Sequence, residues 1–600
     1  MRLGSFLIRQ AERLRRLPWV ARLVLGLAVV AVGALVLVNP FQSLTALVAI
    51  IALALVVDGA ARIGRYRSTG LARLQLVAGL IEIVAAIAIV AWPFISVGTL
   101  ALVVGVSLIV SGVVNLVHAA THGDRRLANL LLGLAFVIFG VLVIVWPDVS
   151  LIVISVAFAV RMLAFGVMVV VRAIRYRENL PPQRDVDEAT AAARPTPRLL
   201  RGLDLAGRVL LLVLALISAA GSVYLHQQLP EPSAFYNAPE SVPATAGKLI
   251  SSEPYTQSVP NGSRGWLILY TTTDVNDKPR VASAFVIAPD APSDTPRDVV
   301  LWDHGTEGAD RQCAPTVLPP SSLPFPFTAP IAALKQQLQE GRVLVGPDYP
   351  GMGTAGAQSY LIGENEGRSA LDAVLAAHQL TDLSLSNRTV VWGHSQGGQA
   401  AIWTGQLAAD YAPDLEILGV AAAAPAADAK GLISTFENST IGKVLGPFVI
   451  RAFSETYADV DALDYVDPRM FAIYDAASRR CFAGSQTAVT ALTVATMYGP
   501  MYTKDPSTGP LGERLDQNKP TGPIAAPLFI AQGAADPLIL PKVQEQYIKD
   551  RCDAGQALRY EEYAGRDHLS VVADDSPFSA ELLTWTDDRF AGKPQQNTCG

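Results

Sequence analysis

The sequence predicts two unlike parts in one chain: a bundle of membrane-spanning helices, followed by an α/β domain with a mostly parallel sheet. The first observation is a charge split. Residues 1–228 contain 21 arginines, no lysine and 10 acidic residues, which gives +11 and leaves −17 for the rest of a chain whose net charge is −6. The second is a set of seven long apolar stretches before residue 228. The third is the alternation of short apolar segments with helical patterns after residue 247, which is typical of a sheet covered on both faces.

The overall composition excludes several other classes of protein. Of 600 residues, 51% are hydrophobic and 17% are charged, whereas soluble domains usually contain about 25% charged residues. These values exclude a disordered chain, a collagen and a small disulfide-packed protein. The length also exceeds the ~100–200 residues of one domain.

The seven apolar stretches have the length of membrane-spanning helices. A helix needs about 20 residues to cross ~30 Å of hydrocarbon, where its backbone groups must bond to one another. The stretches lie at residues 20–38, 43–61, 74–92, 97–118, 127–146, 150–171 and 205–225.

An internal repeat supports the assignment of these stretches to membrane-spanning helices. Three prolines recur at spacings of 53 and 54 residues, each with a serine three positions later, a glycine fourteen positions earlier and a second glycine nineteen positions later. They are Pro40, Pro93 and Pro147, with Ser43, Ser96 and Ser150, Gly26, Gly79 and Gly133, and Gly59, Gly112 and Gly166. We interpret the unit as a helical hairpin used three times, with glycines where helices approach closely.

The distribution of arginine predicts the orientation. Arginines cluster at the N-terminus and in every second connection, whereas the three Pro-Ser turns contain neither Lys nor Arg. Basic residues remain on the cytoplasmic side. The N-terminus is therefore expected in the cytoplasm, and seven crossings place everything after about residue 226 outside.

Two ionisable residues are expected inside the membrane, Glu82 in the third stretch and Arg161 in the sixth. Charge in this position is costly, which favours a functional role. The alternative, which we favour, is a structural role, either a mutual ion pair that locks the bundle or snorkelling of the charged groups to the membrane surface.

Residues 18–175 resemble the HdeD-like acid-resistance membrane family in their three hairpin repeats with Gly and Pro-Ser landmarks. The resemblance implies a six-helix bundle and a stress role, but no chemistry. We divide the chain into this domain (1–176), a cytoplasmic linker (177–204), a seventh membrane helix (205–228), a Pro-rich outer linker (229–246) and an α/β domain (247–600).

The α/β domain carries its chemistry at the ends of expected strands. Gly393-His394-Ser395-Gln396-Gly397 follows a strand at 389–392 and opens a helix at 397–411, as a nucleophile elbow requires. The glycines permit a tight turn, and the helix N-terminus favours developing negative charge. This pattern predicts an α/β-hydrolase with Ser395 as nucleophile.

A serine nucleophile needs a histidine base and an orienting carboxylate, which follow it in this fold in the order acid, then histidine. Asp536 comes after an expected strand at 527–531, and His568 comes after one at 558–563. His568 is also the only histidine downstream of His394. The rival acids are Asp567, Asp574 and Asp575, and a turn-capping role is the alternative for Asp536.

The oxyanion hole needs two backbone N–H groups. We expect one from Gln396, which follows the nucleophile, and the other from Thr306, in a loop after a short strand at 299–302.

The 140 residues between Ser395 and Asp536 exceed what a strand and a crossover need, which predicts a cap at about 428–520. Its apolar runs at 444–453 and 490–502 would line an acyl pocket, present an interfacial lid or form ordinary cap core. The second run contains Met497, Tyr498, Met501 and Tyr502.

Residues 235–590 resemble the secretory lipase family of α/β-hydrolases. The stretches that carry the resemblance are Phe235-Tyr236 with Pro239, residues 267–289, PDYPGMG at 347–353, GHSQGG at 393–398, AQGAADP at 531–537 and AGRDHL at 564–569. The resemblance implies hydrolysis of fatty-acid esters, including triacylglycerols, through Ser395, Asp536 and His568. Members of that family are secreted freely, whereas this chain carries membrane helices.

All four cysteines lie in the outer domain, and export favours disulfides. Three connectivities are possible, and free thiols are the alternative. We favour Cys313–Cys481 and Cys552–Cys599.

The sequence thus predicts a multi-pass membrane protein with an extracytoplasmic serine lipase or carboxylesterase that acts on a lipid or acyl ester. Alternatives are an acyltransferase for envelope lipids and a non-catalytic membrane stress protein. We expect no cofactor and no metal, because nucleotide motifs and clusters with metal-ligand spacing are absent from the outer domain, and its negative charge argues against nucleic acid. The oligomeric state stays open.

Overall fold

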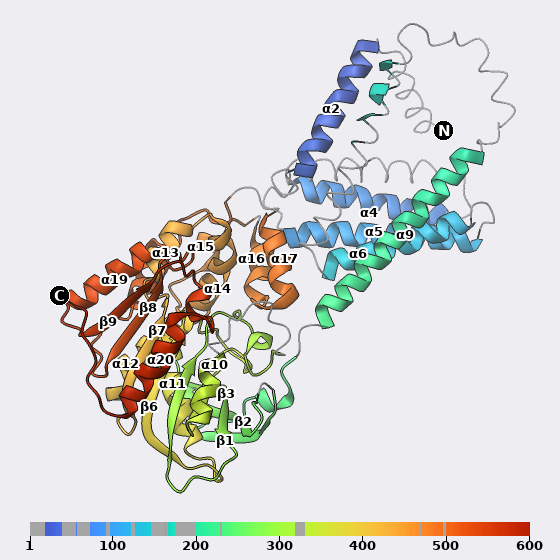
Figure 1. The fold of residues 1–600 in the computed structure, drawn as a ribbon. Helices are drawn as coiled ribbons and strands as arrows, with labels where there is room; N and C mark the ends of the chain where they lie inside the picture. The colour runs from blue at the N-terminus through green and yellow to red at the C-terminus, as the bar shows by residue number, and fades with distance from the viewer. Residues whose placement is uncertain are drawn as a thin grey trace, which may run out of the picture. The chain divides into compact units, whose positions relative to one another are not determined.

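The computed structural model describes residues 19–38, 56, 72–91, 97–121, 126–145, 163, 166–167, 169–171, 173–174, 198–227, 231–257, 259–318, 331–468, 470–495 and 500–599. The chain forms two compact units: Met1–His226 together with two short later segments, Pro468–Ile473 and Leu492–Gly499, and the rest of the chain from Gln227 onward. The first unit is helical and the second is an α/β unit (Figure 1).

The helical unit contains five described helices that coincide with the first, third, fourth, fifth and seventh apolar stretches. They are α2 (Trp19–Val38), α4 (Ala72–Ala91), α5 (Val97–Thr121), α6 (Arg126–Val145) and α9 (Arg198–Gln227). Within the described residues, three helical segments are long and apolar enough to cross a membrane: Leu102–Thr121, Arg126–Val145 and Leu205–Val223. The stretches at 43–61 and 150–171 lie mostly outside the described residues. Helix α9 begins at Arg198, so the last residues of the expected cytoplasmic linker are helical.

Four of the repeated glycines, those whose surroundings the structure describes, are points of backbone contact between helices. A Cβ on Gly112 of α5 would lie 2.8 Å from the carbonyl oxygen of Gly133 in α6. The same relation holds between Gly26 of α2 and Gly166, where the distance would be 3.2 Å. A side chain at these positions would push the helices apart, which explains why the glycines recur at fixed offsets.

Glu82 is buried in α4 and accepts a hydrogen bond from Ser111 Oγ of α5 at 3.0 Å. Its expected partner Arg161 lies outside the described residues. The ion pair therefore stays a prediction.

The α/β unit is built on a nine-stranded sheet. The strands are β1 (Leu249–Tyr255), β2 (Ser263–Thr273), β3 (Pro279–Pro289), β4 (Arg297–Asp303), β5 (Val343–Pro347), β6 (Leu385–His394), β7 (Glu416–Ala423), β8 (Leu528–Gly533) and β9 (Leu558–Tyr563), in the spatial order β1-β2-β3-β5-β4-β6-β7-β8-β9. Strands β1, β2, β3 and β5 pair antiparallel, and the pairs from β5 to β9 are parallel. The sequence also predicts strands at 342–345 and 415–422, and with those at 299–302, 389–392, 527–531 and 558–563 they coincide with β4 to β9; β1, β2 and β3 were not predicted.

Helices cover both faces of this sheet. The adjacent residues Val391 and Trp392 of β6 point to opposite faces of the sheet. Val391 packs on one face, in a core cluster with residues of α11 (Gly363–Ala377) and α12 (Gln396–Tyr411). On the other face, Trp392 Nε1 donates to Thr586 Oγ1 of α20 (Pro577–Phe590) at 3.0 Å. Helix α10 (Ile331–Gln339) contacts α20, and α19 (Pro541–Asp553) contacts β8.

Among the described residues, six helices lie between β7 and β8, where the cap was expected. They are α13 (Ala429–Phe436), α14 (Thr440–Thr456), α15 (Ala462–Tyr465), α16 (Phe471–Arg479), α17 (Gly484–Ala495) and α18 (Gly509–Gln517).

The α/β unit also includes part of the segment that we expected to be an outer linker. Tyr236, in the short helix η2 (Ala234–Tyr236), is 4% exposed, and its hydroxyl lies 2.9 Å from Thr316 Oγ1. Thr316 Oγ1 in turn donates to the buried Asp348 at 2.5 Å. The α/β unit therefore begins before residue 247.

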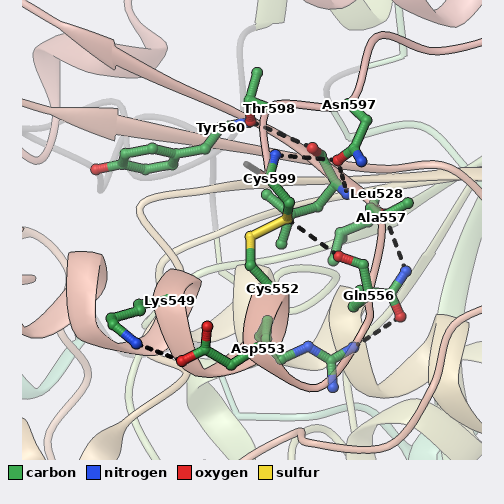
Figure 2. Close-up of a disulfide and its surroundings, with 12 residues drawn as sticks. Leu528, Lys549, Cys552, Asp553, Gln556, Ala557, Tyr560, Asn597, Thr598 and Cys599 are labelled. Carbon is green, nitrogen blue, oxygen red and sulfur yellow. Dashed lines mark hydrogen bonds and ion pairs between the residues drawn. A yellow bond between two sulfur atoms is a disulfide. The ribbon is translucent and has the colours of Figure 1, made fainter.

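The C-terminal tail is tied to the sheet edge by a disulfide between Cys552 of α19 and Cys599 (Figure 2). Beside it, the backbone N–H of Thr598 donates to the carbonyl of Leu558 at 2.8 Å, and the N–H of Tyr560 donates to Thr598 Oγ1 at 2.8 Å. The tail thus satisfies outward-facing groups of the edge strand β9, which would otherwise be open to pairing with another chain.

Candidate active site

Ser395 stands at a strained turn between β6 and α12. Its backbone has φ +60° and ψ −119°, a conformation that residues other than glycine rarely adopt. The flanking glycines are required by close contacts: a Cβ on Gly393 would lie 1.9 Å from the carbonyl oxygen of Gly397, and one on Gly397 would lie 2.0 Å from that of Asp303. The Ser395 N–H donates to Ala423 of β7 at 2.9 Å. The turn therefore holds the serine side chain above the parallel strands.

The structure brings Ser395, His568 and Asp536 into one hydrogen-bonded chain. His568 Nδ1 lies 2.8 Å from Asp536 Oδ2, and His568 Nε2 lies 2.9 Å from Ser395 Oγ. An ionised carboxylate can only accept, so Nδ1 carries the proton and Nε2 is free to accept the serine proton. Such an arrangement suits general-base activation of a hydroxyl.

The carboxylate of Asp536 is held in place by the turn after β8. Its Oδ1 accepts the N–H groups of Leu538 at 2.8 Å and Ile539 at 2.9 Å, while Gln532 Nε2 lies 3.2 Å from Oδ2. The backbone therefore fixes which oxygen faces the histidine.

Two of the rival acids, Asp567 and Asp575, bind other groups. Asp567 accepts from the N–H and Oγ of Ser570, at 2.8 and 2.6 Å, and Asp575 pairs with Arg566 at 3.0 Å.

His394 is a supporting residue that sequence reasoning did not assign. Its ring is buried, and Nε2 lies 2.9 Å from the carbonyl oxygen of His568, to which it donates. Burial, with the neighbouring His568, lowers the pKa of His394 to about 3, so it stays neutral. The one feature of the sequence that could have indicated this role is the position of His394 directly before Ser395 in the G-x-S-x-G motif.

The two expected oxyanion residues, Thr306 and Gln396, line the same pocket as Ser395 and His568. Gln396 is the first residue of α12, where backbone N–H groups have no partner within the helix. Thr306 lies in the loop after β4, and its Oγ1 is 2.9 Å from the Tyr360 hydroxyl. Their roles as donors to an oxyanion at the serine stay predictions.

The pocket leads from Ser395 into the cap and is mostly apolar. Its walls come largely from α13 and α14, with Leu538 and Ile539 from the turn after β8. The apolar cap residues that line it include Leu432, Ile433, Phe436, Leu445 and Val449. The run at 444–453 therefore does contribute to a pocket.

The second apolar run of the cap contributes less. Tyr502 lines the pocket, but Met501 is fully buried in the cap core, and Met497 and Tyr498 lie outside the described residues.

A second disulfide, between Cys313 and Cys481, connects the loop after β4 to the cap, with the two Cα atoms 5.1 Å apart. Next to it, the Phe482 N–H donates to the carbonyl oxygen of Glu307 at 2.7 Å. These links attach the cap to the loop that contains Thr306.

Over the part of the chain that the structure describes, no group of three or more His, Cys, Asp or Glu side chains is arranged to hold a metal ion.

Comparison with known proteins agrees with this geometry. A family model described as "Secretory lipase" matches residues 327–598, and one described as "Short repeat of unknown function (DUF308)", the repeat of HdeD-like membrane proteins, matches residues 24–90, 77–141 and 131–184. Both resemblances are thereby confirmed, and the starts of the three repeats follow the same spacing as the prolines.

Curated relatives are lipases. Lipase 9 of Candida albicans is 24% identical over 430 residues, which cover 65% of this chain and 89% of the relative. Secreted triacylglycerol lipase LIP2 of Malassezia globosa is 25% identical over 425 residues, covering 65% and 89%.

Among solved structures, lipase A of Candida antarctica in its closed state matches with a TM-score of 0.51 and 20% identity, over 62% of this chain and 89% of that one. This likeness concerns the fold, which is that of a capped α/β-hydrolase. With the family match and the lipase relatives, it identifies the α/β part as a hydrolase of the lipase/esterase class.

Proposed function

We propose that the protein is a membrane-anchored serine lipase or carboxylesterase that cleaves fatty-acyl esters through Ser395, His568 and Asp536. The observation that supports this most is the hydrogen-bonded chain of these three side chains at the mouth of an apolar pocket.

In acylation, Ser395 Oγ attacks the ester carbonyl while His568 Nε2 takes its proton. Asp536 holds the ring in the required tautomer and stabilises the imidazolium. The backbone N–H groups of Thr306 and Gln396 receive the negative charge that develops on the carbonyl oxygen. His568 then returns the proton to the leaving alcohol, and an acyl-enzyme remains.

In deacylation, water repeats the cycle. His568 removes a proton from water, which attacks the acyl-enzyme carbonyl, and the carboxylic acid leaves as Ser395 regains its proton. The same acyl-enzyme would pass its acyl group to an alcohol if an acceptor displaced water, so product analysis separates the two reactions.

The apolar pocket supports a fatty-acyl group as the part of the substrate that is recognised. Aliphatic and aromatic side chains of α13 and α14 offer an acyl chain apolar contacts, while the polar groups gather at Ser395. The names of the relatives, which include a secreted triacylglycerol lipase, point to glyceride esters as substrates.

Membrane anchoring is supported by the helical unit. Three described helices have the length and hydropathy of membrane spans, and the HdeD-like repeats are of membrane type. We propose seven crossings with the N-terminus in the cytoplasm and the hydrolase outside, because arginine clusters at the N-terminus and in alternate connections and is absent from the three Pro-Ser turns. The two disulfides agree with an oxidising outer compartment. The anchor would keep the active site close to lipid substrates and raise their effective concentration.

Two experiments test the proposal. Protease added to intact cells should remove the α/β unit and spare the membrane helices. Full protection of the α/β unit while a known outer-face protein is digested would contradict the orientation.

Hydrolysis of p-nitrophenyl esters by the full-length protein in detergent should disappear in Ser395→Ala, and its persistence would contradict the mechanism.

A further inference from the structure

A buried carboxyl that the proposed mechanism does not use lies behind the expected oxyanion hole. Glu366, in the first turn of α11, has no exposed surface. Its Oε1 accepts two hydrogen bonds, from Gln396 Nε2 at 2.6 Å and from the N–H of Leu361 at 3.1 Å. Gln396 is the residue directly after the nucleophile, so Glu366 touches the expected oxyanion hole without lining the pocket itself.

The same segment also holds the other expected oxyanion residue. Tyr360 is buried, and its hydroxyl lies 2.9 Å from Thr306 Oγ1. Between the two contacts, Leu361 has a φ of +56°, which is unusual for a bulky residue and places its N–H toward Glu366. Residues 360–366 therefore bind the side chains of both Thr306 and Gln396.

The surroundings of Glu366 favour its neutral form. Among the described residues, its second oxygen, Oε2, has no hydrogen-bond partner, and no basic side chain pairs with it. Burial, helped by the nearby Asp303 of β4, raises the pKa of Glu366 well above its usual range. The other titratable groups that face it are the hydroxyls of Tyr349 and Tyr360, which carry no positive charge.

A neutral carboxyl suits this place for a chemical reason. Negative charge develops on the substrate oxygen during both steps of ester hydrolysis, and a second negative charge in a low-dielectric site would oppose it. A protonated carboxyl still accepts hydrogen bonds through its carbonyl oxygen, so it can hold Gln396 without that cost.

We propose that Glu366 is a positioning residue that holds the side chain of Gln396, so that the backbone N–H of Gln396 points to the oxyanion formed at Ser395. This inference rests on the proposed hydrolase mechanism. It assigns to Glu366 an effect on the rate of the chemical step and not on binding of the acyl chain, because Glu366 lies outside the pocket wall.

The test compares steady-state hydrolysis of p-nitrophenyl butyrate by four full-length proteins in detergent: wild type, Glu366→Leu, Glu366→Gln and Asp372→Asn. Glu366→Leu removes the acceptor, and we expect kcat to fall about 10- to 100-fold with KM within threefold, since a displaced oxyanion donor costs less than the 10²–10³-fold of a deleted one. Glu366→Gln supplies a neutral acceptor of the same shape and should restore most of the lost kcat.

Asp372→Asn is the matched control. Asp372 is a second buried carboxyl of α11, and burial raises its pKa to about 7, but it accepts from Tyr411 and lines no part of the pocket. Its replacement should leave kcat and KM unchanged. A kcat loss in Asp372→Asn equal to that in Glu366→Leu would show a general effect of α11 and overturn the assignment.

A second readout uses an alkyl trifluoromethyl ketone, which adds to the serine and forms a stable oxyanion. Its inhibition constant should rise in Glu366→Leu by the same factor as kcat/KM falls. If Glu366→Leu does not fold, Gln396→Met removes the same hydrogen bond from the other side and should give the same loss.

The inference is overturned if folded Glu366→Leu or Gln396→Met keeps the wild-type kcat, or if Glu366→Gln is as slow as Glu366→Leu. Failure of the proposed function looks different, because Ser395→Ala would then remain active. An inactive Ser395→Ala together with a fully active Glu366→Leu refutes the positioning role alone.

Discussion

Replacing Asp536 by Asn tests whether the carboxylate sets the tautomer of His568. The two backbone N–H groups on Oδ1, from Leu538 and Ile539, cannot move without disrupting the turn. In Asp536→Asn the amide oxygen is therefore expected to stay on that side, which turns the NH₂ group toward His568. The imidazole must then accept at Nδ1 and carry its proton on Nε2, where it can no longer accept the proton of Ser395.

The expected loss is large because the nucleophile loses its base while the fold is retained. In a serine hydrolase triad, the corresponding change lowers kcat about 10⁴-fold through the wrong tautomer. A 10³- to 10⁴-fold loss corresponds to about 4–5 kcal/mol of barrier height. KM should change little, since Asp536 does not line the pocket.

The assay is hydrolysis of p-nitrophenyl butyrate by the full-length protein in detergent at pH 8, with the melting temperature as a check on folding. Asp567→Asn is the control, because this neighbouring acid accepts hydrogen bonds from Ser570 and does not reach the ring. It should keep kcat within threefold. A folded Asp536→Asn with more than a tenth of the wild-type kcat would refute the reasoning, as would an equal loss in Asp567→Asn.

Three other predictions address the pocket, the buried acid and the tail. Leu445 is a half-buried residue of the pocket wall, and in Leu445→Trp the larger side chain should fill part of the pocket. The value of kcat/KM should then fall more than tenfold for palmitate esters and less than threefold for butyrate esters. Equal losses for both chain lengths would count against an acyl pocket. Burial raises the pKa of Glu307 from about 4.5, its value in the unfolded chain, to about 8 in the folded protein. The protonated side chain therefore contributes most to the free energy of unfolding below pH 4.5, and this contribution is lost as the pH rises to 8. The free energy of unfolding of the wild type, measured by urea titration, should therefore fall by about 3–4 kcal/mol between pH 5 and 8 through Glu307. In Glu307→Gln this fall should be smaller, and an equal fall in both proteins would contradict the prediction. Removing the Cys552–Cys599 disulfide with serines should cost about 4 kcal/mol for a closed loop of 47 residues, seen as a lower melting temperature, and an unchanged one would show that the tail is held by its hydrogen bonds alone.

The parts of the fold that were predictable from sequence are those with a strong local pattern. The parallel strands β4 to β9 are short apolar segments followed by turn or helix signals, and the elbow around Ser395 has a sequence signature of its own. Asp536 and His568 could be placed because the fold fixes their order in the chain.

Strands β1 to β3 were harder to predict. Strand β2 reads SRGWLILYTTT, with an apolar centre and a polar end, and β1 carries polar residues on both faces, so neither alternates cleanly. Tyr236 was likewise assigned to a linker, since its Pro-rich surroundings are typical of one, and only the tertiary contact with Thr316 shows that it is buried.

The supporting residues of the site could not have been found from local sequence. Glu364 and Glu366 are two positions apart on the same helix and look equivalent, yet Glu364 pairs with Arg368 at the surface and Glu366 is buried. Two residues along a helix differ by about 200° in direction, and which face is buried is decided by the position of α12 and the β4 loop. The glycine contacts of the helical unit were predictable as close approaches because the repeat places them at the same offset three times.

The central claim is that Ser395 is the nucleophile of an ester hydrolase. An alkyl fluorophosphonate probe should label the full-length wild-type protein at Ser395, as located by mass spectrometry, and abolish hydrolysis of p-nitrophenyl esters in proportion to labelling. Ser395→Ala should take up no label and show no hydrolysis above background while it retains the wild-type melting temperature. Undiminished hydrolysis by folded Ser395→Ala would contradict the account.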